Sequence, residues 1–204
     1  MTTVLGFDVS SSCIGWALLK INDDLTINFV KMDHIKPTKN GPDLQVLIDT
    51  RDRVSEIINE IEPDHIVIEN IIYYMKGRST ANTIIALATY NRIVCITAFD
   101  YLKKLPELFN VKTIRAGIKK NSFPKKEEIP DLVASHLGIT FPYEKDKKGK
   151  LFPYNFDRAD SIAVALYFCF ILIGKVKRKQ KFPKKLNRKA LQEKRRRRLL
   201  APNI

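Results

Sequence analysis

The stretch DRADSIAVAL, residues 157–166, places two carboxylates three residues apart at the start of a long apolar run. Residues i and i+3 share one face of a helix, so Asp157 and Asp160 are expected to point the same way. Two further acids end short apolar runs, Asp8 after VLGF and Glu69 after HIVI. A carboxylate at such a position is costly to bury without a partner. We therefore expect the four acids to meet at one site.

Four carboxylates from distant segments suit a pair of hard divalent cations, which prefer oxygen ligands. Two such ions can activate water and stabilise the leaving oxygen of a phosphodiester. The plainer interpretation is that each acid, taken alone, is a solvated strand end or a helix cap. The occurrence of all four in one chain favours the two-metal interpretation, with Asp8, Glu69, Asp157 and Asp160 as both metal ligands and catalytic residues.

The composition favours one intracellular globular domain with an extension. The chain has 204 residues, of which 45% are hydrophobic, enough for a domain with its own core. The longest apolar run, residues 161–174, is shorter than a membrane span, and the N-terminus has no basic region typical of a signal peptide. The three cysteines are scattered, which favours reduced thiols, and no Cys/His spacing indicates zinc. We expect a cytoplasmic protein that is neither secreted nor bound to a membrane.

Positive charge is concentrated at the C-terminus. The net charge is +14, and residues 175–198 hold 14 Lys and Arg against one acid, a net charge of +13. We therefore divide the chain into a domain, residues 1–174, and a basic tail, residues 175–204. Such a tail can bind phosphates without reading sequence. The alternatives are a solubilising tail or a targeting signal.

The pattern of apolar residues predicts an α/β fold. Three strands with short turns form an antiparallel meander, and helices then alternate with strands, which is typical of a mixed five-stranded sheet flanked by helices. The expected strands are residues 3–9, 13–21, 26–34, 65–69 and 111–114, and the expected helices are residues 43–61, 79–99, 125–137 and 157–173. Gly138 is the expected C-cap of the third helix.

The second expected helix, residues 79–99, has an unusual composition. Its only charged residue is Arg92, and apolar residues lie in nearly every direction around it. Such a helix is buried on more than one side. The core of the domain can cover one side, and a second subunit could cover another.

This arrangement resembles the ribonuclease H-like fold and, within it, the RuvC family of Holliday-junction resolvases. The resemblance rests on GFDVS at residues 6–10 with GWA at 15–17, on IVIEN at 66–70, and on DRADSIAVA at 157–165. It covers roughly residues 3–173. The chain differs from the family in having Val9-Ser10 where a Pro-Gly pair is frequent, a long Lys-rich loop at residues 141–156, and the basic tail. These differences leave open a bacteriophage or other viral member.

The resemblance implies a function. It implies Mg²⁺ ions, with Mn²⁺ as a substitute and two ions per site, held by the four acids. It implies a homodimer that cuts two strands of a four-way DNA junction symmetrically, because two cuts related by a two-fold axis need two sites. The helix at residues 79–99 would form the dimer interface, and Ile72 or Tyr73 would act as the wedge that unstacks bases. The expected DNA-binding residues are Ile72, Tyr73, Lys76, Arg78, Lys112, Arg115, Lys119, Lys125, Lys126, Arg195, Arg196, Arg197 and Arg198.

Three other functions are alternatives to junction resolution. A nuclease of the same fold that acts on flaps, other branched DNA or RNA–DNA hybrids would use the same acids. A degenerate member that only binds DNA would not need all four. An ATPase of the sugar-kinase and actin type would need glycine-rich phosphate loops, and the eight glycines of this chain form none.

Overall fold

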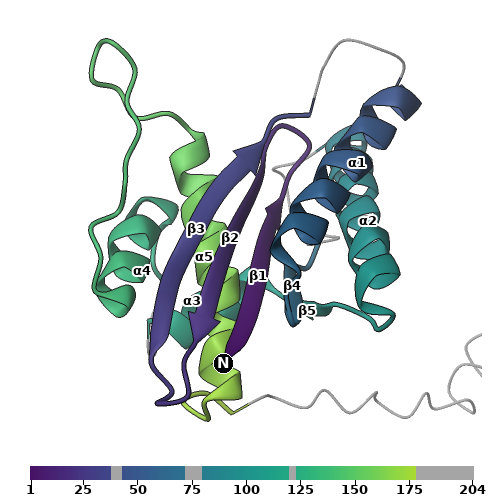
Figure 1. The fold of residues 1–204 in the computed structure, drawn as a ribbon. Coiled ribbons are helices and arrows are strands. Elements are labelled where there is room, and N and C mark those ends of the chain that lie inside the picture. Colours follow the sequence, from purple (N-terminus) through teal and green to yellow (C-terminus); the bar gives the residue numbers. More distant parts are fainter. Residues whose placement is uncertain (38–42, 72–79, 120–122, 178–204) are drawn as a thin grey trace, which may run out of the picture.

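A mixed five-stranded sheet forms the centre of the protein (Figure 1). The computed structural model describes residues 1–37, 43–71, 80–119 and 123–177. The sheet has the order β3-β2-β1-β4-β5, and its five mixed strands confirm the predicted fold class. The antiparallel strands are β1 (Thr2–Val9), β2 (Ile14–Ile21) and β3 (Ile27–Ile35). On the other side of β1, β4 (His65–Glu69) pairs in parallel with β1, and β5 (Glu107–Phe109) pairs in parallel with β4.

Helices cover both faces of the sheet (Figure 1). One face packs against α1 (Asp43–Ile61) and α2 (Ala81–Leu102). The other packs against α5 (Tyr154–Leu172), with α3 (Val111–Ile118) and α4 (Ile129–Leu137) beside it. The sheet therefore separates two cores, and each face can carry a different set of side chains.

The alternation of side chains along β1 decides which face carries which residue. Leu5 and Phe7 are fully buried in the α1/α2 core, whereas Val4 is buried in the α5 core. Side chains in a strand alternate between the two faces. Asp8 therefore lies on the α5 face, together with Val4 and Gly6.

The expected fifth strand is wrong in position, and a helix was missed. Residues 111–114 belong to α3, and the strand is the preceding segment, β5. The side chain of Asn110 accepts a hydrogen bond from the backbone N–H of Lys112 at 2.9 Å and caps α3. This capping overrides the β-propensity of Val111 and Ile114, since an N-cap supplies a partner to a backbone donor that the first turn leaves free.

Helix boundaries differ from expectation at three points. The segment expected as one helix over residues 125–137 is a 3-10 turn, Lys126–Glu128, followed by α4, and Gly138 ends α4 with φ 64° as expected. Helix α5 begins at Tyr154 instead of residue 157, so its two acids lie within the helix. Ser79 lies outside the described residues, and Thr80 caps α2.

Helix α2 is buried on one side only within a single chain. Asn91, Val94, Thr97 and Ala98 are buried, whereas Ile85 and Ile96 are 63% and 59% exposed. By length and composition alone, α2 is the one helix in the described part of the chain that could cross a membrane, so the expected lack of any such segment is not confirmed. A core helix passes the same test, and α2 packs against α1 and the sheet.

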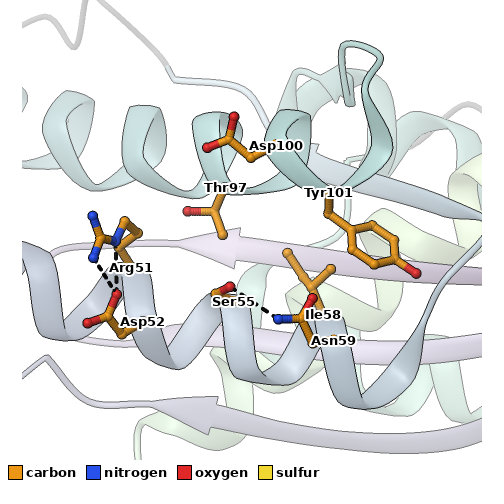
Figure 2. Close-up of a pocket in the computed structure, with 8 residues that line it drawn as sticks. All are labelled: Arg51, Asp52, Ser55, Ile58, Asn59, Thr97, Asp100 and Tyr101. Carbon is orange, nitrogen blue, oxygen red and sulfur yellow. Dashed lines mark hydrogen bonds and ion pairs between the residues drawn. The ribbon is translucent and has the colours of Figure 1, made fainter.

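A cavity of about 510 Å³ lies between α1 and α2 (Figure 2). Ser55 and Ile58 of α1 and Thr97 and Tyr101 of α2 are among the residues that line it. It is on the side of the sheet opposite α5 and includes none of the four acids singled out in the sequence.

Two glycines let α5 lie directly on the sheet. A Cβ atom at Gly6 would come within 2.5 Å of the carbonyl oxygen of Ser161, and one at Gly15 within 2.2 Å of the carbonyl oxygen of Asp157. Only a residue without a side chain permits these approaches. Gly15 pairs with Asp8 across the β1–β2 ladder, so the first turns of α5 are held against the end of β1.

Candidate active site

The two strand acids lie side by side at one end of the sheet. β1 and β4 are neighbouring parallel strands, and Phe7 pairs with Ile68. Asp8 and Glu69 each follow these residues by one position and therefore share a face. That face is the one covered by α5, since Ile66 and Ile68, which alternate with Glu69, belong to the opposite core.

The two helix acids are brought to the same end by α5. The contact between Gly15 and Asp157 places this part of α5 over the end of β1. Asp160 lies one turn further along and is buried, with 6% of its surface exposed. The sheet and the helix together bring the four predicted acids to one site.

Burial and mutual repulsion raise the pKa values of three of these acids. Burial, followed by the charges of Glu69 and Asp160, raises the pKa of Asp8 well above its usual value. Burial and the charge of Asp160 raise the pKa of Glu69 to about 7. Burial also raises the pKa of Asp160, against the opposing effects of Lys126 and Arg115. The acids thus repel one another in a region with little water, an arrangement typical of functional sites.

Two basic residues that are expected to bind DNA contact these acids. The Lys126 ammonium donates a hydrogen bond to Asp157 at 2.9 Å and lies 3.6 Å from the Asp160 carboxylate. Arg115 lies 3.4 Å from Asp160. Burial opposes the charge of Lys126, but its hydrogen bond to Asp157 and the neighbouring carboxylates outweigh this effect and raise its pKa above the usual value.

The donor set fits hard divalent cations. All four candidate ligands offer carboxylate oxygens, which Mg²⁺ and Mn²⁺ prefer. A bound cation would relieve the repulsion that raises the pKa values of Asp8 and Glu69. In the described ranges, however, no three Asp, Glu, His or Cys side chains are already grouped closely enough to hold a metal ion. The acids thus share one site, and their side chains would have to draw closer to chelate a metal.

Cys13 is a neighbour of the acids that the sequence did not single out. Burial, followed by the charge of Asp157, a hydrogen bond to it and the charge of Asp8, raises the pKa of the Cys13 thiol to about 12. Burial and the neighbouring negative charges therefore favour the protonated thiol over the thiolate. Cys13 lies just before β2, across the turn from the end of β1, and this position in the sequence could have indicated that it is close to Asp8.

Only some of the other expected DNA-binding residues lie in the part of the chain that the structure describes. Lys112, Lys119 and Lys125 are exposed near α3 and the 3-10 turn, and Lys119 pairs with Glu128 at 2.8 Å. The remaining ones, Ile72, Tyr73, Lys76, Arg78 and Arg195 to Arg198, lie outside the described residues.

The raised pKa of Glu69 predicts a pH-dependent stability. Its folded pKa of about 7 exceeds the ordinary value of 4.5, so the folded protein binds more protons than the unfolded chain between these pH values. Stability should therefore fall as pH rises through this window. In metal-free buffer, Glu69→Gln should raise the free energy of unfolding at pH 8 by on the order of 1–3 kcal/mol and have little effect at pH 4.

Urea unfolding of both proteins at several pH values measures this effect. Glu60→Gln is a suitable control, because Glu60 is exposed and its ion pair with Lys31 lies at the surface. An equal response of the two variants at pH 8 would show that Glu69 is not destabilised by its neighbours.

Comparison with known proteins finds similarity to crossover junction endonucleases and Holliday junction resolvases. No protein-family model matches the chain. The chain is 28% identical over 170 residues to the crossover junction endodeoxyribonuclease RuvC of Christiangramia forsetii, covering 80% of this chain and 77% of the relative. It is similar in fold to T. thermophilus RuvC in complex with Holliday junction substrate, with a TM-score of 0.65, 17% identity and coverage of 85% and 97% of the two chains.

A third similar structure is the yeast mitochondrial Holliday junction resolvase Ydc2, with a TM-score of 0.57 and 16% identity over 82% of this chain and 78% of that one. The chain is thus RuvC-like in sequence and has the ribonuclease H-like fold, as its motifs indicated.

Proposed function

We propose that this chain is a metal-dependent endonuclease that resolves four-way DNA junctions by paired, symmetric phosphodiester cleavage. The observation that carries the proposal is the meeting of Asp8, Glu69, Asp157 and Asp160 at one end of a RuvC-like fold. Relatives named as crossover junction endodeoxyribonucleases and Holliday junction resolvases support the substrate.

The chain's own residues have distinct parts in this reaction. Asp8 and Glu69 are fixed by the sheet, and Asp157 and Asp160 by the packing of α5, so the four carboxylates would hold two Mg²⁺ ions. Such a pair supplies an activated water and stabilises the leaving oxygen. Lys126 and Arg115 contact the carboxylates and can also attract the phosphate, since both carry positive charge at the site.

The functional assay is cleavage of matched substrates by the full chain. A four-way junction, a flapped duplex and an RNA–DNA hybrid of the same sequence should be compared in Mg²⁺ and in Mn²⁺. We expect symmetric paired cuts in the junction and slower cleavage of the other two substrates. Preferential cleavage of the flap or the hybrid would overturn junction resolution and leave the same four acids as the site of another nuclease.

The proposed enzyme is a homodimer that acts inside the cell. Ile85, Ile96 and Phe99 are exposed on α2 at spacings of 11 and 3 residues, which place them along one face of the helix. A second copy of the chain can cover this face and provide the second active site. A DNA substrate and the free thiols of the three cysteines support an intracellular location.

Two substitutions on α2 separate dimer formation from folding. Ile96→Asp places a charge on the exposed face and should give a folded monomer, whereas Val94→Asp places it in the core, where Val94 is fully buried, and should prevent folding. Sedimentation and circular dichroism measure the two outcomes. A monomeric unmodified protein at micromolar concentration would contradict the dimer.

A further inference from the structure

A lysine-rich loop projects from the end of the protein that carries the four acids. It precedes α5 and is the green loop at the upper left of Figure 1. We call residues 144–152 the lysine arm. Lys145 and Leu151 form an antiparallel bridge across it, so the arm is a short hairpin.

Hydrogen bonds within the arm fix its tip. One carboxylate oxygen of Asp146 accepts from the backbone N–H of Lys148 at 2.8 Å and of Lys150 at 2.9 Å. The backbone N–H of Asp146 donates to the carbonyl of Lys150, and Gly149 adopts φ 81° to close the turn. An acidic side chain used in this way shapes the turn.

The base of the arm is anchored to the helix that carries two of the acids. Glu144 forms an ion pair with Arg158, which is 5% exposed and follows Asp157 directly in α5. Tyr154 donates a hydrogen bond to Glu144 at 2.7 Å, and Asn155 donates to its carbonyl at 2.7 Å. Glu144 is itself exposed, but its partners Arg158, Tyr154 and Asn155 are buried in α5, and together they fix the direction of the arm relative to the active site.

The positive charges of the lysine arm are not neutralised by any acid in the described part of the chain. Its four lysines are exposed and make no ion pair with any described acid. The two acids of the arm are used internally, Glu144 by Arg158 and Asp146 by the turn. Four ammonium groups gathered on a fixed hairpin repel one another, and an anionic partner would relieve this repulsion. The four are Lys145, Lys147, Lys148 and Lys150.

We propose that the lysine arm binds the phosphates of a DNA duplex next to the cleaved bond. The inference rests on the proposed nuclease function, because that function brings DNA to the end of the sheet from which the arm projects. Three extended residues from Glu144 to the tip span about 10 Å. At 3.4 Å per base pair this reaches about three base pairs along the duplex from the anchor. The arm therefore contacts the duplex leading into the junction, and it contributes affinity without reading sequence.

The test compares two double substitutions in the full chain. Lys147→Gln with Lys148→Gln removes two charges from the tip, and Lys103→Gln with Lys104→Gln removes two exposed charges after α2 as a matched control. Binding to a four-way junction is measured between 50 and 200 mM salt, beside the thermal stability of each variant. We expect the arm variant to lower the slope of log K against log salt by about 1 to 2, at about 0.9 per phosphate contact. The control should leave the slope unchanged.

Phosphate-ethylation interference on the same junction provides a second measurement. Unmodified protein should show interference at duplex phosphates that flank the cut, and the arm variant should lose it. Equal slopes and equal interference patterns in the arm variant and the unmodified protein would overturn the role of the arm. In that case cleavage of the junction by all three proteins would still support the nuclease function. A lack of cleavage by the unmodified protein would instead overturn the nuclease function itself.

Discussion

Asp8→Asn is expected to abolish cleavage of a four-way junction while leaving junction binding largely intact. The amide keeps the size of the side chain but removes the negative charge that a divalent cation needs. Metal-ion catalysis contributes several kcal/mol to transition-state stabilisation. At about 1.4 kcal/mol per factor of ten, its loss lowers the rate by about a thousandfold or more.

The measurement is single-turnover cleavage beside a binding titration in Ca²⁺, which occupies oxygen sites. Binding should persist, because the substitution removes no cation that contacts phosphate. Glu69→Gln and Asp160→Asn should behave in the same way. Asp23→Asn is the control, since Asp23 lies in the turn after β2 and pairs with the N-terminal amine. Cleavage by Asp8→Asn at the rate of the unmodified protein would exclude the assigned site.

Deletion of all residues after Gly174 is expected to lower affinity for every DNA shape alike. It removes a net charge of +13 and leaves a nearly neutral domain. Catalysis at low salt should persist, because the truncated domain retains the four acids and the exposed residues Lys112, Lys119 and Lys125. If five tail residues contact phosphates, the slope of log K against log salt should fall by about four to five.

The comparison needs junction and duplex DNA, with full-length and truncated protein on each. Phosphate contacts position a protein without specifying sequence, so the loss of affinity should be similar for both. Identical slopes for the two proteins would show that the tail does not bind DNA and would favour a targeting function. A loss confined to the junction would show that the tail recognises branched structure.

The strand pattern predicted much of the candidate site from the sequence. The apolar runs VLGF and HIVI predicted that Asp8 and Glu69 end strands, and the i, i+3 spacing predicted that Asp157 and Asp160 share one face of a helix. These are local patterns. They survive folding because β1 and β4 are buried on both faces, which requires continuous apolar runs, and because residues three apart share a helix face. The fifth strand was misplaced, since the capping of α3 by Asn110 outweighed the β-propensity of the residues after it.

The sequence by itself determined the fold class, and it predicted the four candidate acids at the ends of two strands and on the last helix. Only the tertiary structure showed that Lys126 and Arg115 contact these acids, and that Arg158 anchors the lysine arm through Glu144. The physical reason is the range of the interactions. The pattern of burial can be predicted from residues that are neighbours in the sequence. The pairing of charges 14 to 45 positions apart depends on which helices pack together, so no local pattern predicts it.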